Sequence, residues 1–314
     1  MKDRVLALIV TYNSAEFIGA AVRSCLRQEI PVLVVDNGSQ DGTTAAIPAD
    51  PRVQVIANTH NLGFAGGVNQ GVRVREAELY LLLNPDVELL DPIAPLVNAI
   101  QENGHSASTG LLVDSTGEPQ KGFSFRRFPT ASILAFEVLG LNRIWPSNPV
   151  NRRYRCLDLD MMEPREVEQP AGACLLFRRS DWALLDGFDE RFHPVWFEDV
   201  DFCRRLKFTG AKIWFTPLVR VLHHGGHSVQ KIELGCRQRF WYGSLLKYAA
   251  KHFPPLSRRL VAVTVAVAAV PRVLIPRASG PFQTRIQSIQ QIWTMAWQCF
   301  QSGASAEDVP APGA

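Results

Sequence analysis

Acidic side chains and one histidine lie where they could bind a metal–diphosphate group and activate a hydroxyl. Asp36 and Asp86 each end or follow an apolar run that predicts a buried strand. We therefore expect both carboxylates at one edge of a parallel sheet, where open α/β folds bind ligands. Two carboxylates, a histidine and a glycine-rich turn at that edge would suit a nucleotide diphosphate bound through a divalent cation.

The segment LLLNPDV (Leu81–Val87) is a candidate metal site. Its apolar strand leads to Asn84 and Asp86, and Pro85 favours an extended turn between them. Asp86 is then a hard oxygen ligand for Mg²⁺ or Mn²⁺, an ion that also holds substrate phosphates. The alternative is that Asp86 is an ordinary residue of the turn that leaves the strand.

The segment VLHHGGHS (Val221–Ser228) follows a predicted strand and contains three of the seven histidines of the chain. A neutral imidazole is a suitable ligand for a borderline metal such as Mn²⁺. Neighbouring side chains on a strand point to opposite faces, so only one of His223 and His224 should enter the site. We assign His223; the alternative is a pair of surface histidines near a turn.

The segment WFEDVDFC (Trp196–Cys203) places Glu198, Asp199 and Asp201 at the start of a predicted helix. Acids in a first turn are stabilised by the helix dipole, which would explain them without any chemistry. The flanking aromatic residues, however, would desolvate a carboxylate and raise its basicity. We predict that Asp199 is the general base and that Glu198 lies beside it in the site.

The ends of the first two predicted strands could bind a nucleoside. These ends are adjacent in a doubly wound sheet, so Thr11, Tyr12 and Asp36 could frame the base and ribose. The Asp36 carboxylate would accept hydrogen bonds from a pyrimidine N3–H or a ribose hydroxyl. The alternative for Asp36 and the residues after it is a helix-capping turn.

The segment HNLGFAGGVNQG (His60–Gly71) is a candidate phosphate-binding turn. Gly63, Gly66 and Gly67 would let the backbone approach a ligand, and a helix from Ala65 would favour phosphate at its start. The spacing matches neither the dinucleotide-binding nor the P-loop pattern. The alternative is close packing of a helix on the sheet.

Four strand–helix repeats open the chain and would position these side chains. Their apolar runs, rich in Val, Leu and Ile, predict a parallel sheet covered on both faces, built from right-handed βαβ units. The predicted strands are Arg4–Thr11, Val32–Asp36, Val53–Ala57 and Leu79–Asn84. The predicted helices are Ala15–Arg27, Thr43–Ile47, Ala65–Glu76 and Asp91–Glu102.

The periodicity is weaker after Asn103. The predicted elements there are strands in Thr109–Gly117, Glu168–Arg178, Ala211–Pro217 and Val219–His223, and helices at Ser180–Asp186, Glu198–Phe208, Arg237–His252 and Pro281–Phe300. We predict an α/β domain over residues 1–235, with a nucleotide-binding half (1–103) and a second half (104–235). A helical basic extension (236–302) and a disordered tail (303–314) follow.

Composition narrows the class of protein. The 314 residues are 46% hydrophobic and 20% charged, which predicts a sizeable core and argues against global disorder. A net charge of only +3 argues against a nucleic-acid partner. The six cysteines are dispersed without CxxC spacing, which suits a reduced cytosolic setting, and the apolar N-terminus is better explained as the first strand than as a signal peptide.

The C-terminal region has an uneven charge distribution. Between Glu233 and Glu307 there are nine basic residues and no acidic one. The apolar run Leu260–Val270 is shorter than the roughly 20 residues that a spanning helix needs. We interpret this region as a helix resting on an anionic membrane surface; the alternative is a basic helix docked on the catalytic domain.

Taken in order, these motifs resemble the family 2 glycosyltransferases, which have the GT-A fold, and above all their bacterial rhamnosyltransferase-like branch. The resemblance covers about residues 4–230. The matching motifs are VTYN (Val10–Asn13), VVDNGSQDGT (Val34–Thr43), NLGFAGGVNQG (Asn61–Gly71), LLNPDV (Leu82–Val87), GACLLFRR (Gly172–Arg179), GFDERF (Gly187–Phe192), FEDVDF (Phe197–Phe202) and HHGGHS (His223–Ser228).

The resemblance implies transfer of a sugar from a nucleotide donor with inversion at the anomeric carbon. It implies that Asp36 contacts the base or ribose and that Asp86, with His223, binds a divalent cation, Mg²⁺ or Mn²⁺, on the donor diphosphate. Asp199, in the position of the family's Glu-Asp pair with Glu198, would deprotonate the acceptor hydroxyl.

The resemblance also implies a set of donor-binding residues. These are Thr11, Tyr12, Asn13, Asp36, Asn61, Gly63, Gly66 and Asn84. The metal motif of the family is often Asp-x-Asp, whereas this chain has Asn84 at the first position, as the rhamnosyltransferase-like branch commonly does.

The expected substrates are a nucleotide sugar, dTDP-rhamnose, and a cell-wall or surface-polysaccharide acceptor that is a glycan or a lipid-diphosphate-linked sugar. The expected location is cytoplasmic, or peripheral at the inner face of the cell membrane. Two other functions stay open. One is a nucleotidyltransferase, although VTYNSAEF stands where that class has a glycine-rich phosphate loop; the other is a non-catalytic nucleotide-sugar or carbohydrate-binding protein.

Overall fold

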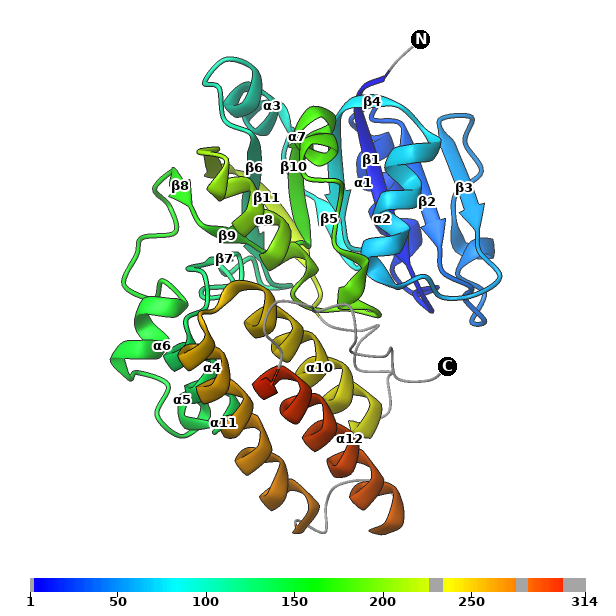
Figure 1. The fold of residues 1–314 in the computed structure, drawn as a ribbon. Coiled ribbons are helices and arrows are strands. Elements are labelled where there is room, and N and C mark those ends of the chain that lie inside the picture. Colours follow the sequence, from blue (N-terminus) through cyan, green and yellow to red (C-terminus); the bar gives the residue numbers. More distant parts are fainter. Residues whose placement is uncertain (1–2, 226–233, 275–281, 302–314) are drawn as a thin grey trace. The chain divides into compact units, whose positions relative to one another are not determined.

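The computed structural model of this 314-residue chain describes residues 3–225, 234–274 and 282–301. The chain divides into two compact units. The first contains the described residues of 1–128, 155–190 and 198–228, and the second those of 129–154, 191–197 and 229–314. The first unit is a sheet covered by helices and the second is helical (Figure 1).

A nine-stranded sheet forms the centre of the first unit. Its order is β3-β2-β1-β4-β10-β6-β11-β5, with β8 paired to β11. The bounds are β1 Asp3–Thr11, β2 Val32–Asp36, β3 Val53–Ala57, β4 Ala77–Leu83, β5 Val87–Leu89, β6 Ala107–Val113, β8 Arg165–Val167, β10 Cys174–Arg178 and β11 Ile213–His223. β10 is antiparallel to both of its neighbours, whereas β1 to β4, β6 and β11 share one direction, so the mostly parallel sheet is confirmed.

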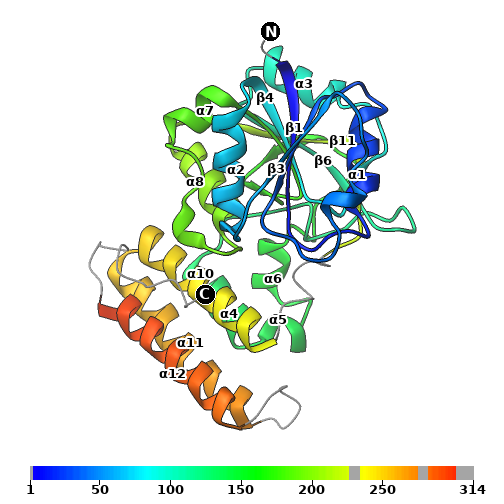
Figure 2. The ribbon, with the colours of Figure 1, turned by 90° about the vertical axis from the view of Figure 1, so that its right-hand side faces the viewer.

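Helices cover both faces of this sheet (Figure 2). The helices of the first unit are α1 Ile18–Leu26, α2 Gly63–Val74, α3 Ala94–Gln101, α7 Arg179–Leu184 and α8 Glu198–Phe208. Alternate residues of β1 enter two separate cores because successive side chains of a strand point to opposite faces. Leu6 and Leu8 pack in the core that includes α2 and α8, and Ala7 and Ile9 in the core that includes α1 and α3.

Glycines allow α2 to approach β1 closely. A Cβ atom on Gly67 would lie 2.7 Å from Val10 Cγ1, and one on Gly71 would lie 2.4 Å from Leu8 Cδ1. Both distances are shorter than real Cβ contacts, so a side chain at either position would force the buried Val10 or Leu8 side chain to shift. For Gly67, close packing is therefore the better interpretation.

Several predicted elements differ from the observed ones. The helix predicted at Thr43–Ile47 is only the short 3₁₀ turn η1, Thr44–Ala46, and β3 is a partly exposed edge strand rather than a strand buried on both faces. The strand predicted at Glu168–Arg178 is divided into the end of β8, β9 (Gln169–Pro170) and β10, of which β9 pairs with β7 (Phe125–Arg126) in a separate small sheet.

The two strands predicted around Pro217 are one strand, β11. It is irregular between Thr216 and Arg220. Because proline cannot donate a ladder hydrogen bond, a proline is accommodated at such an irregularity without ending the strand. The short strand β5, antiparallel to β11, was not predicted at all.

The second unit contains more of the chain than the predicted extension 236–302. Its helices are α4 Ala131–Val138, α5 Leu141–Ile144, α6 Pro149–Tyr154, α10 Leu234–His252, α11 Pro255–Leu274 and α12 Phe282–Gln301; η2 (Glu190–Phe192) lies at the boundary of the units. Residues 129–154 belong here because α4, with buried Ile133, Leu134 and Val138, packs against α11. This grouping of the chain differs from the predicted division at residue 235.

The predicted C-terminal helices are present as α10, α11 and α12. Pro271 does not end α11, which continues to Leu274. Across residues 3–225, 234–274 and 282–301, none of the helices combines the length and hydropathy that crossing a membrane requires. The predicted disordered tail, 303–314, lies outside the described residues.

Candidate active site

The ends of β1 and β2 meet as predicted. Thr11 is the parallel register partner of Asp36, and both are buried, with Tyr12 exposed just beyond. The Asp36 carboxylate accepts hydrogen bonds from the Ser39 backbone N–H (3.1 Å) and from the Ser39 hydroxyl. Within the part of the chain that the structure describes, the buried Thr11 Oγ1 has no hydrogen-bond partner.

Asn13 connects the β1 end to the turn after β2. Its backbone is left-handed, with φ of 51°. Its N–H donates to Ser39 Oγ (2.8 Å), and its side-chain oxygen accepts from the Gln40 N–H (2.8 Å). These hydrogen bonds hold the turn in place without a ligand. A structural role of the turn therefore does not exclude the binding of a nucleoside.

The start of α2 is held by two asparagines. Asn61 Oδ1 accepts a hydrogen bond from the Gly63 N–H (2.7 Å), and the Gly63 carbonyl accepts one from Asn37 Nδ2 (2.9 Å). Gly66 faces Leu62, whose Cβ would lie 3.1 Å from a Cβ added at the glycine. These contacts explain the local structure; a donor-binding role of Asn61, Gly63 and Gly66 stays a prediction.

Asp86 lies beside His223, as the metal-site prediction requires. Asp86 is 6% exposed, in the turn between β4 and β5, and His223 ends β11 at 3% exposure. Asp86 Oδ1 is 3.9 Å from His223 Nε2. The carbonyl of Asp86 accepts a hydrogen bond from the N–H of His224 (3.1 Å), which holds the turn against β11.

The two histidines point to different partners, as the alternation along β11 predicts. His224 Nε2 is 3.8 Å from Glu88 Oε1, and its ring centroid is 5.1 Å from that of Phe17. His223 alone of the two therefore faces Asp86. The rest of the HHGGHS motif, from residue 226, lies outside the described residues.

Gln120 orients the His223 ring. Its amide nitrogen donates to the His223 carbonyl (2.8 Å), so its amide oxygen is the atom that faces His223 Nδ1 (2.9 Å). Because that oxygen can only accept, Nδ1 carries a proton. In the neutral form of the ring, the lone pair would then be on Nε2, the nitrogen that faces Asp86. The ring also stacks on Phe123, with centroids 5.0 Å apart.

The Asp86–His223 pair fits a divalent cation by the chemistry of its donor atoms. A carboxylate oxygen and an imidazole nitrogen face each other, and the second ring nitrogen is held by an outer partner, as metal-binding histidines usually are. In the described ranges no group of three or more His, Cys, Asp or Glu side chains could hold a metal. A site with two protein ligands suits a cation whose other ligands are water and substrate phosphates.

Asp199 lies in the first turn of α8, half-buried, with both oxygens engaged. Oδ2 accepts from the Gly172 N–H (2.9 Å) and Oδ1 from the Val200 N–H (2.8 Å). Burial raises the pKa of the Asp199 carboxyl above its ordinary value, although these two hydrogen bonds and the charge of Arg126 oppose the shift. The carboxylate is therefore a stronger base than an exposed aspartate.

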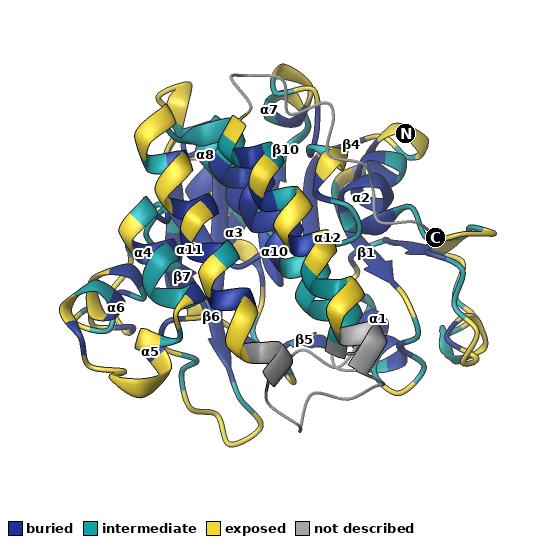
Figure 3. Cartoon of the chain, turned by 60° about the horizontal axis from the view of Figure 1, so that its bottom comes forward, coloured by how far each residue is buried: buried dark blue, intermediate teal, exposed yellow. Residues whose placement is uncertain are grey.

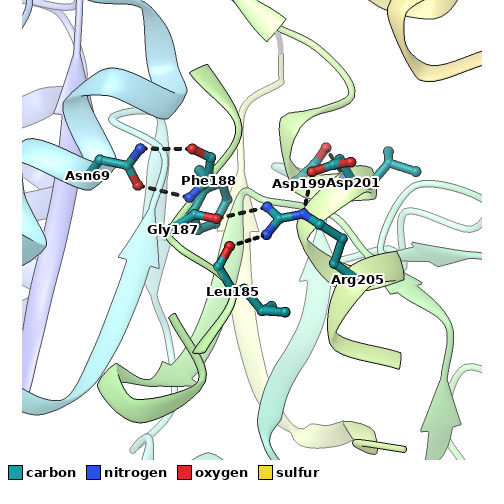
Figure 4. A network of polar contacts seen from close by, with 8 residues as sticks. Asn69, Leu185, Gly187, Phe188, Asp199, Asp201 and Arg205 are labelled. Atoms are coloured by element: carbon teal, nitrogen blue, oxygen red, sulfur yellow. Dashed lines mark hydrogen bonds and ion pairs between the residues drawn. The ribbon is translucent and has the colours of Figure 1, made fainter. Parts of the chain in front are cut away.

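The other two acids of this helix start have different environments. Glu198 is 4% exposed, whereas Asp201 is fully buried and forms an ion pair with Arg205 (2.7 Å). Arg205 also donates to the carbonyls of Leu185 (2.6 Å) and Gly187 (2.8 Å) (Figure 4). Asp201 is thus a structural residue that ties α8 to the loop after α7.

Asn69 of α2 holds the next part of that loop (Figure 4). Its amide donates to the Phe188 carbonyl (2.8 Å) and accepts from the Phe188 N–H (2.9 Å). It also accepts from Trp182 Nε1 (3.0 Å) and donates to Glu190 (2.8 Å). The glycine-rich helix and the helix that carries Asp199 therefore hold one loop between them.

The Asp86–His223 pair and Asp199 belong to one region of the first unit. The Asn84 N–H donates to the Ala173 carbonyl (3.1 Å), and the preceding residue, Gly172, donates to Asp199. The turn that carries Asp86 and the helix start that carries Asp199 are thus joined through two consecutive residues. Arg126 links the two parts a second time. Its guanidinium lies 5.5 Å from the centroid of the Phe123 ring, which stacks on His223, and its charge lowers the pKa of Asp199.

Sequence reasoning missed three residues of this region. Gln120, Phe123 and Arg126 contact or influence the predicted site, yet none was proposed as part of it. The only signal was compositional, because the segment from Lys121 is rich in arginine and aromatic residues. The pairing of Gln120 with His223 spans 103 positions, and no local pattern indicates it.

Comparisons of the sequence with known proteins give consistent matches. The sequence profile of glycosyl transferase family 2 matches residues 7–183. An N-acetylglucosaminyl-diphospho-decaprenol L-rhamnosyltransferase of Mycobacterium tuberculosis (strain CDC 1551 / Oshkosh) is 31% identical over 245 residues, which are 73% of this chain and 78% of that protein. Rhamnosyltransferase WbbL of Escherichia coli (strain K12) is 26% identical over 163 residues, 51% of this chain and 57% of that protein.

A solved structure shows the same fold. It is the mannosyltransferase PcManGT from Pyrobaculum calidifontis in complex with GDP-Man and Mn²⁺. The TM-score is 0.52 at 16% sequence identity, and the match covers 95% of this chain and 85% of that one. The predicted GT-A fold is confirmed.

Proposed function

The chain belongs to glycosyl transferase family 2, and from that premise we propose that it transfers rhamnose from dTDP-rhamnose, with inversion, to a lipid-diphosphate-linked sugar. The observation that carries this proposal is the meeting of Asp86, His223 and Asp199 in one region at the carboxyl ends of the parallel strands. The choice of rhamnose rests on two relatives whose names state a rhamnosyltransferase activity.

Asp199 acts as the general base in this mechanism. It accepts the proton of the acceptor hydroxyl while the hydroxyl oxygen forms a bond to the anomeric carbon of the sugar. The bond between that carbon and the diphosphate oxygen breaks, and the nucleoside diphosphate leaves with the bonding electrons. The raised pKa of Asp199 suits this step, because the proton is transferred to a carboxylate that holds it well.

Asp86 and His223 would hold a divalent cation, Mg²⁺ or Mn²⁺, at the donor diphosphate. Such a cation stabilises the negative charge that grows on the leaving group. Asp36 and the Thr11 hydroxyl would bind the base and ribose, together with Tyr12 and Asn13 at the end of β1; the pairing of Thr11 with Asp36 and the Thr11 hydroxyl, unsatisfied among the described residues, support this. Asn61, Gly63, Gly66 and Asn84 complete the proposed donor site.

The acceptor half of the reaction takes place at the inner face of the cell membrane. A relative is named for an N-acetylglucosaminyl-diphospho-decaprenol acceptor, a lipid that resides in a bilayer. The alternatives of a nucleotidyltransferase and a non-catalytic sugar-binding protein receive no comparable support.

A donor screen tests the proposal. The purified enzyme is incubated with Mn²⁺, a short-chain lipid-diphosphate-linked N-acetylglucosamine and each of several nucleotide sugars, and the released nucleoside diphosphate is measured. We expect release from dTDP-rhamnose together with a rhamnosylated product. Release from another donor alone would contradict the choice of sugar, and no release from any donor would contradict the reaction.

A further inference from the structure

Helix α11 of the second unit exposes one continuous apolar stripe. Leu256, Leu260, Val263, Val267 and Val270 are 82%, 51%, 50%, 58% and 41% exposed. Their spacing of four, three, four and three residues places them on one side of the helix. The opposite side is the one that packs, because Val261 and Val265 are fully buried. The stripe is therefore not part of the packed core, and exposed segments recur along α11 in Figure 3.

Helix α12 extends this stripe with two tryptophans. Trp293 and Trp297 are 47% and 59% exposed and lie one helical turn apart. The Trp293 indole N–H donates to the Ala266 carbonyl of α11 (3.0 Å), which fixes the ring against the edge of the stripe. We call the surface formed by the five α11 residues, Trp293 and Trp297 the apolar face.

Charge indicates what covers the apolar face. The chain has nine basic residues and no acidic one between Glu233 and Glu307. One of them, Arg259, is exposed on α11 between Leu256 and Leu260, and its guanidinium lies 5.4 Å from the Phe300 ring centroid on α12. An apolar surface on an acid-free segment, with Arg259 exposed beside it, is complementary to an anionic lipid surface.

A second copy of the chain is a poorer occupant. The heptad spacing of the stripe would suit a helix pair, but such pairs are usually completed by opposite charges beside the seam. A second apolar face would bring another Arg259 and no acidic partner from the same acid-free segment. Tryptophan, moreover, is enriched where an apolar phase meets water at a membrane boundary.

We propose that the apolar face is the surface by which this enzyme lies on an anionic membrane. The leucine and valine side chains enter the boundary between headgroups and acyl chains, the two indoles lie at headgroup level, and Arg259 contacts lipid phosphate. The proposal rests on the proposed function in one respect, because a lipid-linked acceptor explains why the enzyme would bind a membrane. The binding itself is independent of catalysis.

The test is vesicle flotation of the full-length chain. The vesicles contain phosphatidylcholine alone or phosphatidylcholine with phosphatidylglycerol, and the salt concentration is low or high. The test variant carries Leu260→Gln and Val267→Gln. The matched control carries Leu184→Gln and Leu218→Gln, at residues of the first unit that are 68% and 69% exposed. Thermal unfolding verifies that both variants are folded.

We expect wild type and control to float with phosphatidylglycerol vesicles at low salt, and less at high salt. The test variant should bind roughly tenfold more weakly or worse, because buried apolar groups supply much of such binding. An equal loss in the control, or no binding by wild type, would overturn the proposal. So would a concentration-dependent dimer, seen by light scattering, that only the test variant loses.

A second measurement separates this proposal from the proposed function. Transfer to a water-soluble, short-chain acceptor should have the same kcat in the test variant as in wild type, since neither substituted residue lies in the catalytic region. If wild type shows no transfer but floats as described, the proposed function fails and the membrane face stands. If wild type transfers rhamnose normally but does not float, the membrane proposal fails and the proposed function stands.

Discussion

At the scale of single residues, Asp199 is the centre of the proposed chemistry. Its carboxylate is half-buried, is held by two backbone N–H groups and has a raised pKa caused by burial. A base must be ionised to accept a proton. The rate should therefore fall on acidification at a pH above the ordinary aspartate pKa of about 3.9.

Replacement of this base has a defined kinetic effect. In Asp199→Asn we expect kcat to fall by about 10²–10⁴-fold, because an amide cannot accept the proton. Donor affinity should change little. The control is Glu166→Gln, which removes only an exposed carboxylate paired with Lys212 (2.6 Å). A variant that keeps wild-type kcat would contradict the assignment.

The same substitution should alter stability in a pH-dependent way. A folded-state pKa above the unfolded one means that ionisation of Asp199 opposes folding. Any stability associated with the protonated group is complete below the unfolded pKa and is lost as the pH rises through the folded pKa. The melting temperature of Asp199→Asn relative to that of wild type should therefore rise between pH 3 and pH 7, whatever the amide costs by losing one of the two acceptor oxygens. A difference that does not change with pH would contradict this.

Gln120 gives a prediction on ligand geometry. Without its amide, His223 can adopt either tautomer, so Gln120→Ala should weaken Mn²⁺ binding in the presence of dTDP by about 10–100-fold. Electron paramagnetic resonance measures the bound Mn²⁺, and ¹⁵N spectra of the metal-free protein report the tautomer of His223. Gln28→Ala is the matched control, because Gln28 also bonds backbone groups, those of Asp91 and Ile93, far from the site. Unchanged spectra in Gln120→Ala would contradict the role of the amide.

At the scale of elements, α8 is placed by the buried Asp201–Arg205 pair. Arg205 side-chain exposure is 18% and that of Asp201 is 0%. Removing one partner leaves a buried charge, so Arg205→Ala should lower the free energy of unfolding by roughly 3 kcal/mol. Arg220→Ala breaks the exposed pair with Asp91, in which the arginine is 55% exposed, and should cost less than about 1 kcal/mol. Urea unfolding followed by circular dichroism measures both, and equal losses would contradict the account.

The elements also show which predictions a sequence supports. β2, β3 and α8 have the predicted bounds, because a short run rich in Val, Leu and Ile or an acid-led amphipathic segment is a local property. β5 is only three residues long and exists because β11 pairs with it. A short segment whose strand character depends on a distant partner leaves no periodicity to detect.

At the scale of the whole molecule, the adjacency of the strand ends followed from topology. Parallel order predicted that Thr11 would meet Asp36, and alternation along β11 predicted that one histidine alone would face Asp86. The contact by which Gln120 orients His223 could not be predicted. Gln120 lies in a segment without regular elements, and its contact with His223 depends on the folded path of that segment.

The division of the chain was also only partly predictable. Residues 129–154 belong with the C-terminal helices because buried side chains of α4 pack against α11, more than a hundred positions away. A boundary inferred from composition, in contrast, must fall at a single point in the sequence. Such a boundary cannot describe a unit assembled from separate segments.

The central claim is that Asp86 and Asp199 serve one reaction in different roles. The most direct measurement compares Asp86→Asn and Asp199→Asn for Mn²⁺-dependent dTDP binding by calorimetry and for rhamnose transfer. We predict that Asp199→Asn binds dTDP with Mn²⁺ as wild type does but transfers rhamnose about 10²–10⁴-fold more slowly, and that Asp86→Asn loses both metal-dependent binding and transfer. Full metal-dependent binding by Asp86→Asn, or wild-type transfer by Asp199→Asn, would contradict the account.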